Sequence, residues 1–220
     1  MSERKLLIAT IVSVVAFAII AGLVFLSGAF ASWDQAASVW YNQLELGPSL
    51  GGLFVAASEY GREYFWIGLL VVMLGFGDSE TKEMAVQLAA VFVVGIVAGE
   101  ALKAMLFRAR PEDVVVRVAP DLNSSFPSGH ALIVTIGATF ALLAFRKKWV
   151  AGLLALEALV VCISRVYVGA HFPSDVLAGA VAGVAIACGG LIVERRYFTK
   201  AVKRVSAAVV RVLHSGPLRL

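Results

Sequence analysis

Two apolar segments joined by a short basic turn decide the fold of this chain. Residues 131–168 read ALIVTIGATFALLAFRKKWVAGLLALEALVVCISRVYV, in which the basic tripeptide at 146–148 separates two apolar runs. A membrane-spanning helix needs about 20 mainly apolar residues, with a range of roughly 17–25. The segment therefore predicts two antiparallel spanning helices, with the basic turn on the cytoplasmic side.

The composition of the whole chain supports this interpretation. Of its 220 residues, 60% are hydrophobic and 15% are charged, and the mean hydropathy is +0.88. An average soluble domain is about 45–50% apolar and about 25% charged. These values argue against a soluble globular domain, and also against a disordered chain, which needs low hydrophobicity and high charge. We therefore expect a single all-α, polytopic membrane domain covering residues 1–220.

Outward from this hairpin, the same criterion predicts six transmembrane helices. We expect them at about 6–30, 61–77, 84–107, 129–145, 149–168 and 174–193. The segment 61–77 has the shortest apolar run. The first span also admits a signal-peptide interpretation, because Ala29-Phe30-Ala31 resembles a cleavage site, but its apolar run is longer than a signal sequence needs.

Two further segments have helical amphipathic patterns. Trp33, Ala37 and Trp40 recur at helical spacing among polar residues, which predicts an interfacial amphipathic helix between the first two spans or, equally, a connector packed on the core. After the last span, the basic segment 194–220 interleaves apolar and cationic residues. It is typical of an amphipathic helix that lies on anionic lipids.

The distribution of lysine and arginine predicts the orientation. If the N-terminus is cytoplasmic, 6 of the 19 basic residues lie in the outer half and 13 lie inside. The six outer residues are Arg62, Lys103, Arg108, Arg110, Arg117 and Arg165. We therefore expect a protein of the plasma membrane with both termini in the cytoplasm. The basic pI of about 9.2 reflects these anchors, so we predict no nucleic-acid partner.

Ionisable residues within or beside membrane spans are costly, and they indicate function. Lys103 and Arg110 are seven residues apart, which would place them on one face of a helix that Pro111 ends. Pro127-Ser128-Gly129-His130 opens the fourth span, where free N–H groups at a helix N-terminus suit an anion.

A third cluster completes the candidate site. Ser164 and Arg165 end the fifth span, and His171 and Asp175 lie at the start of the sixth, one helical turn apart. A carboxylate at that spacing can bond Nδ1–H of the histidine, orient the ring and raise the nucleophilicity of Nε2. Because the fourth span descends and the fifth returns, all three clusters should meet at the outer face. Such a set of cations suits a phosphate, and no carboxylate cluster is present to hold Mg²⁺.

The three clusters together resemble the signature of the type 2 phosphatidic acid phosphatase superfamily. The matching residues are Lys103-x6-Arg110-Pro111, Pro127-Ser128-Gly129-His130 and Ser164-Arg165-x5-His171-x3-Asp175. They cover about 70 residues in the expected order, and the six-span layout is similar to the membrane branch of that family. Each motif alone is weak, but their conjunction is specific.

The resemblance implies a role for each residue. His171 would be the nucleophile that forms a phosphohistidine, Asp175 would orient it, and His130 would protonate the leaving oxygen and then activate water. The phosphate oxygens would be held by Lys103, Arg110, Ser128, Gly129 and Arg165. The family implies neither a metal nor another cofactor, and its lipid substrate would enter sideways from the bilayer.

The expected activity is hydrolysis of a lipid phosphomonoester or diphosphate. The small size resembles microbial members, which favours a polyprenyl diphosphate over phosphatidic acid or phosphatidylglycerol phosphate. Two alternatives remain open at this point. The phosphohistidine could pass its phosphate to an alcohol, or the fold could serve a non-catalytic membrane or transport protein.

Other residues receive structural expectations. Glu100 and Glu157 lie within predicted spans, where a buried hydrogen bond is the expected role. Glycines spaced four apart, at 95 and 99 and at 179 and 183, predict close helix packing within the fold. The loop after the third span should carry solvated charges, namely Arg108, Glu112, Asp113, Arg117 and Asp121. No role is expected for His214.

Overall fold

The computed structural model describes residues 1–119 and 123–215, with side chains to residue 208. Its described parts consist of helices and loops. The elements are α1 (Glu3–Leu26), α2 (Gly28–Asn42), α3 (Gly47–Tyr60), α4 (Glu63–Phe76), α5 (Ser79–Met105), α6 (Gly129–Ala144), α7 (Lys148–Tyr167), α8 (Pro173–Val193), the π-helical turn η1 (Glu194–Phe198) and α9 (Thr199–Ser215).

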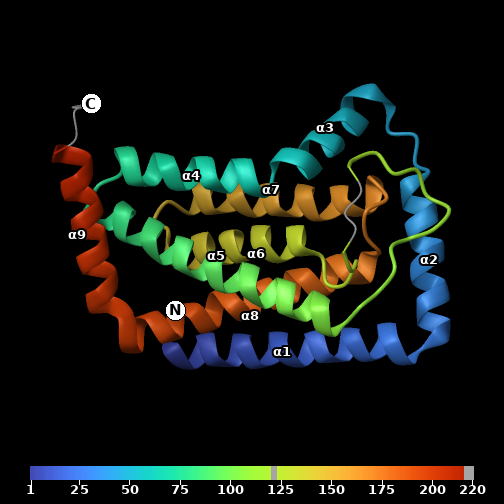
Figure 1. The fold of residues 1–220 in the computed structure, drawn as a ribbon, viewed down its shortest axis with the longest axis horizontal. Helices are drawn as coiled ribbons and strands as arrows, with labels where there is room; N and C mark the ends of the chain where they lie inside the picture. The colour runs from blue at the N-terminus through green and yellow to red at the C-terminus, as the bar shows by residue number, and fades with distance from the viewer. Residues whose placement is uncertain (120–122, 216–220) are drawn as a thin grey trace.

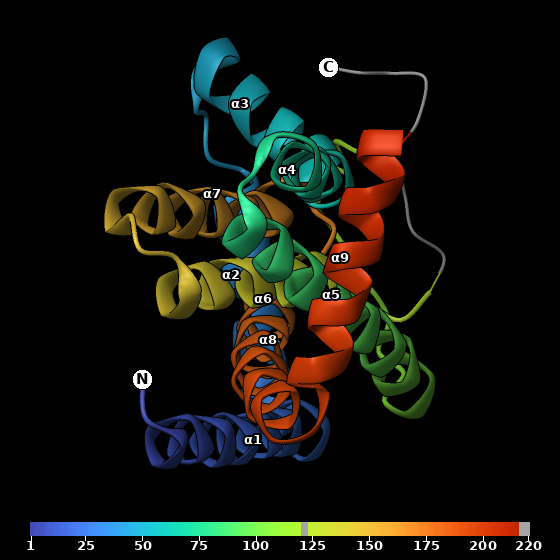
Figure 2. The same cartoon turned by 90° about the vertical axis from the view of Figure 1, so that its left-hand side faces the viewer.

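Most of the helices run along the long axis of the molecule, and others lie across its ends. Helices α1, α4, α5, α6, α7 and α8 form the lengthwise bundle, α2 crosses one end, and α9 crosses the other (Figure 1). Seen end-on, α6 lies in the middle, between α5, α7 and α8 (Figure 2), and it packs against all three. Helix α1 lies on the outside, along α8.

Glycines allow α8 and α5 to approach α6 closely. A Cβ atom added at Gly183 would lie 2.6 Å from the carbonyl oxygen of Leu132, and one added at Gly179 would collide with the carbonyl oxygen of Ser128. On the other side, Gly95 of α5 faces the side chain of Ile136. The expectation that the paired glycines serve packing within the fold is therefore confirmed.

The bundle has the properties of a multi-pass membrane protein. Among the described residues, four helical segments are long and apolar enough to cross a bilayer: α1, α5, α7 and the segment from Pro173 to Ala208. Helices α4 and α6 are apolar but shorter. Large apolar side chains on the outer faces, such as Val12, Val71 and Leu153, are exposed, as expected for residues that contact lipid.

The helix boundaries differ most from the predicted spans in three places. Helix α5 begins at Ser79, five residues before the predicted start, because Asp78 caps it and its Oδ1 accepts a hydrogen bond from the Thr81 N–H at 2.8 Å. The first helix ends at Leu26 rather than near residue 30, because Ser27 starts α2 and its Oγ accepts a hydrogen bond from the Phe30 N–H at 3.3 Å. Helix α3 was not predicted at all. The turn at Gly61 and Arg62 separates it from α4, and α4 occupies the second predicted span.

The N-terminus and α9 lie at the same end of the bundle, away from α2 (Figure 1). Arg196 of η1 forms an ion pair with Glu3, and Arg195 Nη1 donates to the carbonyl oxygen of Met1 at 3.1 Å. The side chain of His214 lies outside the described residues, as does Asp121.

Candidate active site

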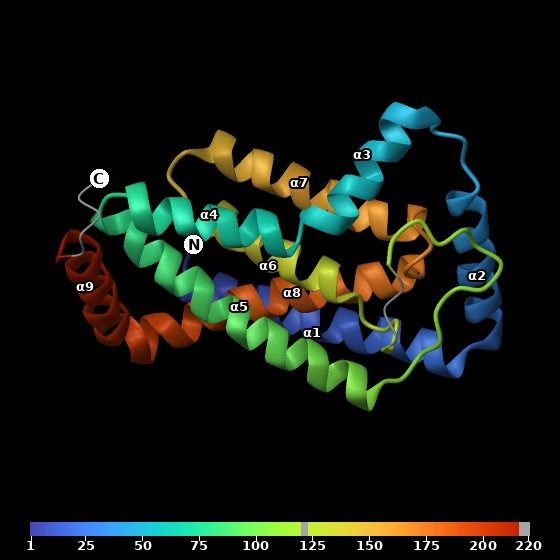
Figure 3. The same cartoon turned by 45° about the horizontal axis from the view of Figure 1, so that its top comes forward.

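The predicted site residues come together at the end of the bundle that α2 crosses. Lys103 ends α5, His130 starts α6, Arg165 ends α7, and His171 and Asp175 flank the start of α8. All five side chains are buried. Figure 3 shows the chain that leaves α5 running alongside α2, to which it is joined by hydrogen bonds between Asn42 and Val115.

Two cations face the start of α6. A Cβ atom added at Gly129 would lie 3.4 Å from Arg62 Nη1 and 3.7 Å from Lys103 Nζ, which is van der Waals contact, so both cations lie directly beside this residue. Ser128 is the N-cap, and its Oγ accepts from the Ala131 N–H at 3.4 Å. The helix therefore presents its N-terminal N–H groups to a positively charged cavity, which is an arrangement that attracts anions.

The hydrogen bonds of His171 define its tautomer. Its Nδ1 lies 2.8 Å from the carbonyl oxygen of Ser125 and 3.6 Å from Asp175 Oδ2. A carbonyl oxygen only accepts, so Nδ1 carries the proton and Nε2 keeps its lone pair. The closer partner of Nδ1 is thus a backbone carbonyl rather than the expected carboxylate. Asp175 also binds the same residue, because Ser125 Oγ donates to its Oδ2 at 2.8 Å.

The surroundings of His171 keep the ring neutral. Its side chain is 1% exposed, and this burial lowers its pKa well below the usual value. The positive charges of Arg165, Arg110 and Lys103 lower the pKa further. A neutral imidazole with a free Nε2 lone pair can act as a nucleophile.

His130 has the complementary arrangement. Its Nδ1 lies 3.4 Å from Arg62 Nη1. A guanidinium has donors only, so this contact is a hydrogen bond when Nδ1 accepts, and the ring proton then resides on Nε2. The two histidines therefore offer one nitrogen that can attack and one N–H that can donate a proton.

Arg110 reaches the site by a different route from the predicted one. Helix α5 ends at Met105, so Arg110 and Lys103 do not share a helix face, and that part of the prediction was wrong. The chain turns away because its backbone pairs with a later segment: the Ser125 N–H donates to the carbonyl oxygen of Arg108 at 2.9 Å. From this loop, Arg110 Nη1 donates to the carbonyl oxygen of Ala170 at 2.6 Å, beside His171.

Arg108 is not solvated, contrary to the prediction. Its Nη1 lies 2.6 Å from Asp175 Oδ1, and its Nη2 lies 2.8 Å from Asp34 Oδ2 of α2. The guanidinium also stacks on the ring of Phe172, 3.7 Å from its centroid. Both carboxylates are fully buried, and a buried carboxylate needs a paired cation, which explains why this loop arginine turns inward.

The polar side of α2 faces the site. Asp34, Ser38 and Asn42, spaced four apart, are fully buried, whereas Trp33 and Trp40 are 59% and 67% exposed. This helix therefore turns its polar residues toward the protein and its aromatic residues away from it.

Arg117 is also bound rather than solvated. Its Nη1 donates to the carbonyl oxygen of Tyr167 at 2.8 Å, and its Nη2 donates to that of Asn42 at 2.9 Å. It thus joins the ends of α7 and α2, because the last carbonyls of a helix need donors from outside the helix. The loop residues Glu112 and Asp113 are exposed, as predicted.

The two glutamates within predicted spans do not behave as predicted. Glu100 is exposed on α5, where it borders a groove. The carboxylate oxygens of Glu157 are buried, but they make no hydrogen bond among the described residues, and neither does the nearby Trp66 Nε1. The expected buried hydrogen bond is therefore absent at Glu100, whereas buried Glu157 has Trp66 Nε1 beside it as a donor.

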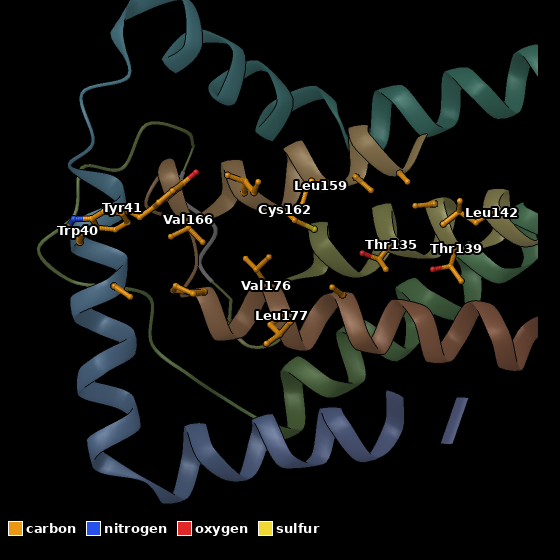
Figure 4. A pocket seen from close by; sticks show the side chains of 17 residues that line it. Trp40, Tyr41, Thr135, Thr139, Leu142, Leu159, Cys162, Val166, Val176 and Leu177 are labelled. Carbon is orange, nitrogen blue, oxygen red and sulfur yellow. The ribbon is translucent and has the colours of Figure 1, made fainter. Parts of the chain in front are cut away.

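Two apolar grooves follow different faces of α6. The first, about 400 Å³, lies between α4, α5 and α6, and its charged end is lined by Arg62, Glu63, Glu100 and Gly129. The second, about 760 Å³, lies between α6, α7 and α8 and is lined by Thr135, Cys162 and Leu177, with Trp40 of α2 at its end (Figure 4). No charged side chain lines the second groove, so the first is the one that meets the catalytic cluster.

Two buried histidines, one of them with a free Nε2 lone pair, lie among buried cations at one end of an apolar helical bundle, which is an arrangement that suits phosphoryl chemistry. The family assignment follows from comparison. Residues 84–198 match the model of the PAP2 superfamily, and the chain belongs to that superfamily. It is a hydrolase that acts on phosphoester or diphosphate bonds, and more specifically a lipid phosphatase.

Relatives and solved structures agree with this assignment. The chain is 41% identical to an undecaprenyl-diphosphatase of Sulfolobus acidocaldarius over 65% of this chain and 68% of the relative. It is 28% identical to undecaprenyl-diphosphatase BcrC of Bacillus subtilis over 76% and 88% of the two chains. The fold is similar to a transmembrane PAP2-type phosphatidylglycerolphosphate phosphatase from Bacillus subtilis, with a TM-score of 0.69, 24% identity, and 86% and 96% of the two chains covered.

Three side chains that lie at the site in the structure had no predicted role. Ser125 and Asp34 were not singled out, and Arg62 was noted only as an outer cation. Arg108, discussed above, was placed in solvent. A usable signal did exist: Asp34, Ser38 and Asn42 recur every fourth residue, which marks a polar helix face with its own partners.

Proposed function

We propose that this protein removes the terminal phosphate of a polyprenyl diphosphate through a phosphohistidine, without a metal. The observation that carries the proposal is the opposed pair of tautomers, with a free Nε2 lone pair on His171 and a proton on Nε2 of His130. The names of the two undecaprenyl-diphosphatases that this chain resembles favour the same substrate class.

In the first step, Nε2 of His171 attacks the terminal phosphorus, and the bond from that phosphorus to the bridging oxygen breaks. Lys103, Arg110 and Arg165, together with the N–H groups at the start of α6, stabilise the charge on the equatorial oxygens. Once phosphorylated, the His171 ring is positively charged. Ser125 and Asp175 then hold its Nδ1 side.

In the second step, a water molecule attacks the phosphohistidine and inorganic phosphate leaves. The proton of that water leaves on the phosphate, and the Nε2–H of His130 is placed to hydrogen-bond the leaving oxygen in the first step and the phosphate in the second. The Asp175 carboxylate is held by Arg108 and Ser125, so it can balance the positive ring of the intermediate without moving.

The lipid tail would lie in the 400 Å³ groove, which begins at Arg62 and Gly129 and continues between apolar side chains of α4 and α5. A substrate could therefore enter sideways from the bilayer, with its phosphates at the charged end. The active-site end would face outward at the plasma membrane, with the N-terminus and α9 inside. The exposed Lys200, Lys203 and Arg204 of α9 would then bind anionic lipids of the inner leaflet.

Phosphate release from a defined substrate panel tests this proposal. Purified protein in detergent, with and without EDTA, is given undecaprenyl diphosphate, phosphatidic acid and phosphatidylglycerol phosphate. We expect the highest kcat/KM on the diphosphate, changed less than about twofold by EDTA. Preference for either phospholipid would reassign the substrate. Transfer of label to an added alcohol would indicate a phosphotransferase, and no phosphate from any substrate would contradict the catalytic assignment.

A further inference from the structure

Arg62 stands at the turn between α3 and α4, outside the three motifs that define the family resemblance. Its Nη1 lies 3.4 Å from His130 Nδ1, and its guanidinium also forms an ion pair with Glu63. The same Nη1 would lie 3.4 Å from a Cβ atom at Gly129. Arg62 thus lies at the junction of the catalytic cluster and the 400 Å³ groove, which it lines together with Gly129.

The cations of the site divide between the two histidines. Arg62 Nη1 lies 3.4 Å from His130 Nδ1, whereas Arg110 Nη1 donates to the carbonyl oxygen of Ala170, the residue before His171. His171 attacks the phosphorus, and His130 faces the group that leaves. Arg62 is therefore the cation on the leaving-group side, and Arg110 is its counterpart on the side of attack.

The chemistry of the leaving group decides what such a cation is for. A phosphomonoester releases an alkoxide, which needs a proton and carries no further charge to bind. A lipid diphosphate releases a lipid monophosphate, whose second pKa is about 6, so it can leave unprotonated near neutral pH but with two negative charges. A guanidinium binds such a group through two parallel hydrogen bonds.

We infer that Arg62 forms a subsite for the leaving phosphate, which selects lipid diphosphates over lipid phosphomonoesters. In the reaction, the His171 Nε2–phosphorus bond forms and the bond from phosphorus to the bridging oxygen breaks. The electron pair stays on that oxygen, which becomes part of the lipid monophosphate held by Arg62. This inference rests on the proposed phosphatase activity and specifies its substrate class.

The test compares two substrates in the same variant. Arg62→Gln should lower kcat/KM for undecaprenyl diphosphate by about 100-fold, the effect of removing one charged donor from developing charge. It should lower kcat/KM for phosphatidic acid by less than about threefold. Glu63→Gln is the matched control, because it removes the ion pair and keeps the cation, and it should change both values by less than about threefold.

An equal loss on both substrates in Arg62→Gln would overturn the inference, because Arg62 would then only support His130 or the fold.

Inhibition supplies a second measurement. Inorganic diphosphate should inhibit Arg62→Gln about 100-fold more weakly than wild type, while inhibition by inorganic phosphate should change less than about threefold. If Arg62→Gln does not fold, Arg62→Lys keeps the charge without the bidentate fork, and we expect an intermediate loss on the diphosphate alone. A wild-type protein that releases phosphate from neither substrate would instead overturn the proposed function.

Discussion

The two ends of the helical bundle use charged side chains in different ways. At the end crossed by α2, Arg108 is 11% exposed and contacts two carboxylates that are fully buried. At the other end, Arg146 pairs with Glu80 at 2.9 Å, but these side chains are 82% and 50% exposed. Exposed pairs contribute about 0–1 kcal/mol, whereas a buried charge that loses its partner is strongly destabilising. Burial, rather than the number of charges, therefore distinguishes the catalytic end.

The largest expected effect tests whether the chemistry is confined to the catalytic end. His171→Gln should reduce phosphate release by about 10⁴-fold or more, because it removes the attacking nitrogen. His214→Gln, a change of the same kind in the C-terminal tail, should have less than a twofold effect. Steady-state assays and trapping of the phosphorylated enzyme with a labelled substrate measure both. Substantial turnover in His171→Gln would mean that another group attacks.

The second prediction compares the two arginines directly. Arg108→Met should destabilise the protein by about 3–5 kcal/mol, because Asp34 and Asp175 would remain buried without their cation. This corresponds to a fall of roughly 10 °C in Tm, whereas Arg146→Met should change Tm by less than about 3 °C. Thermal unfolding in one detergent measures both variants. Similar shifts of Tm in the two variants would contradict the proposed difference in how strongly the two arginines stabilise the protein.

The third prediction concerns the protonation of His171. A histidine with an ordinary pKa of about 6.5 is about 90% protonated at pH 5.5. Burial and the neighbouring cations lower the pKa of His171, so its ring should stay neutral at that pH, with its Nε2 lone pair still available. NMR of ¹⁵N-histidine-labelled protein measures this, with the signal assigned by its absence in His171→Gln. Arg110→Gln should raise the pKa of His171, and titration of wild type near pH 6.5 would contradict the effect.

The smallest effect on activity should come from labelling the two ends. In a Cys162→Ala, Cys188→Ala background, Val116→Cys should react with an impermeant thiol reagent added outside whole cells. Lys147→Cys, at the opposite end, should react only after lysis. Both side chains are exposed, so neither change should alter turnover by more than about twofold. The reverse labelling pattern would invert the proposed orientation.

The sequence predicted the bundle and the identity of the clustered side chains better than their routes to the site. Apolar runs specify lipid-exposed helices regardless of tertiary contacts, so the long helices were found. The end of α5 depends on backbone pairing between Arg108 and Ser125, which are 17 residues apart, and no local pattern indicates it. Arg110 was therefore assigned to the wrong kind of element, although the site does include it.

Residues that act through long-range contacts were beyond the sequence patterns. The pairing of Arg108 with Asp34 joins α2 to a loop 74 positions later, and an isolated loop arginine gives the same sequence signal as a solvated one. Helix α2 shows the same ambiguity. Its polar face could meet water or protein, and periodicity gives only the faces, not their surroundings. To predict that Arg62 lies at the site, one would need to know that the turn between α3 and α4 packs beside the start of α6.

The close contact between α6 and α8 has a consequence for how this enzyme can vary. Gly179 and Gly183 bring α8 against the backbone of α6, and the Ser128 N–H donates to the carbonyl oxygen of Asp175 at 3.0 Å. Contact between the two main chains thus sets the distance between His130 and His171. One added methyl group at Gly183 would push α8 away from α6 and increase the distance between His171 and His130. A variant of this protein can therefore lose activity although every side chain of the site is unchanged.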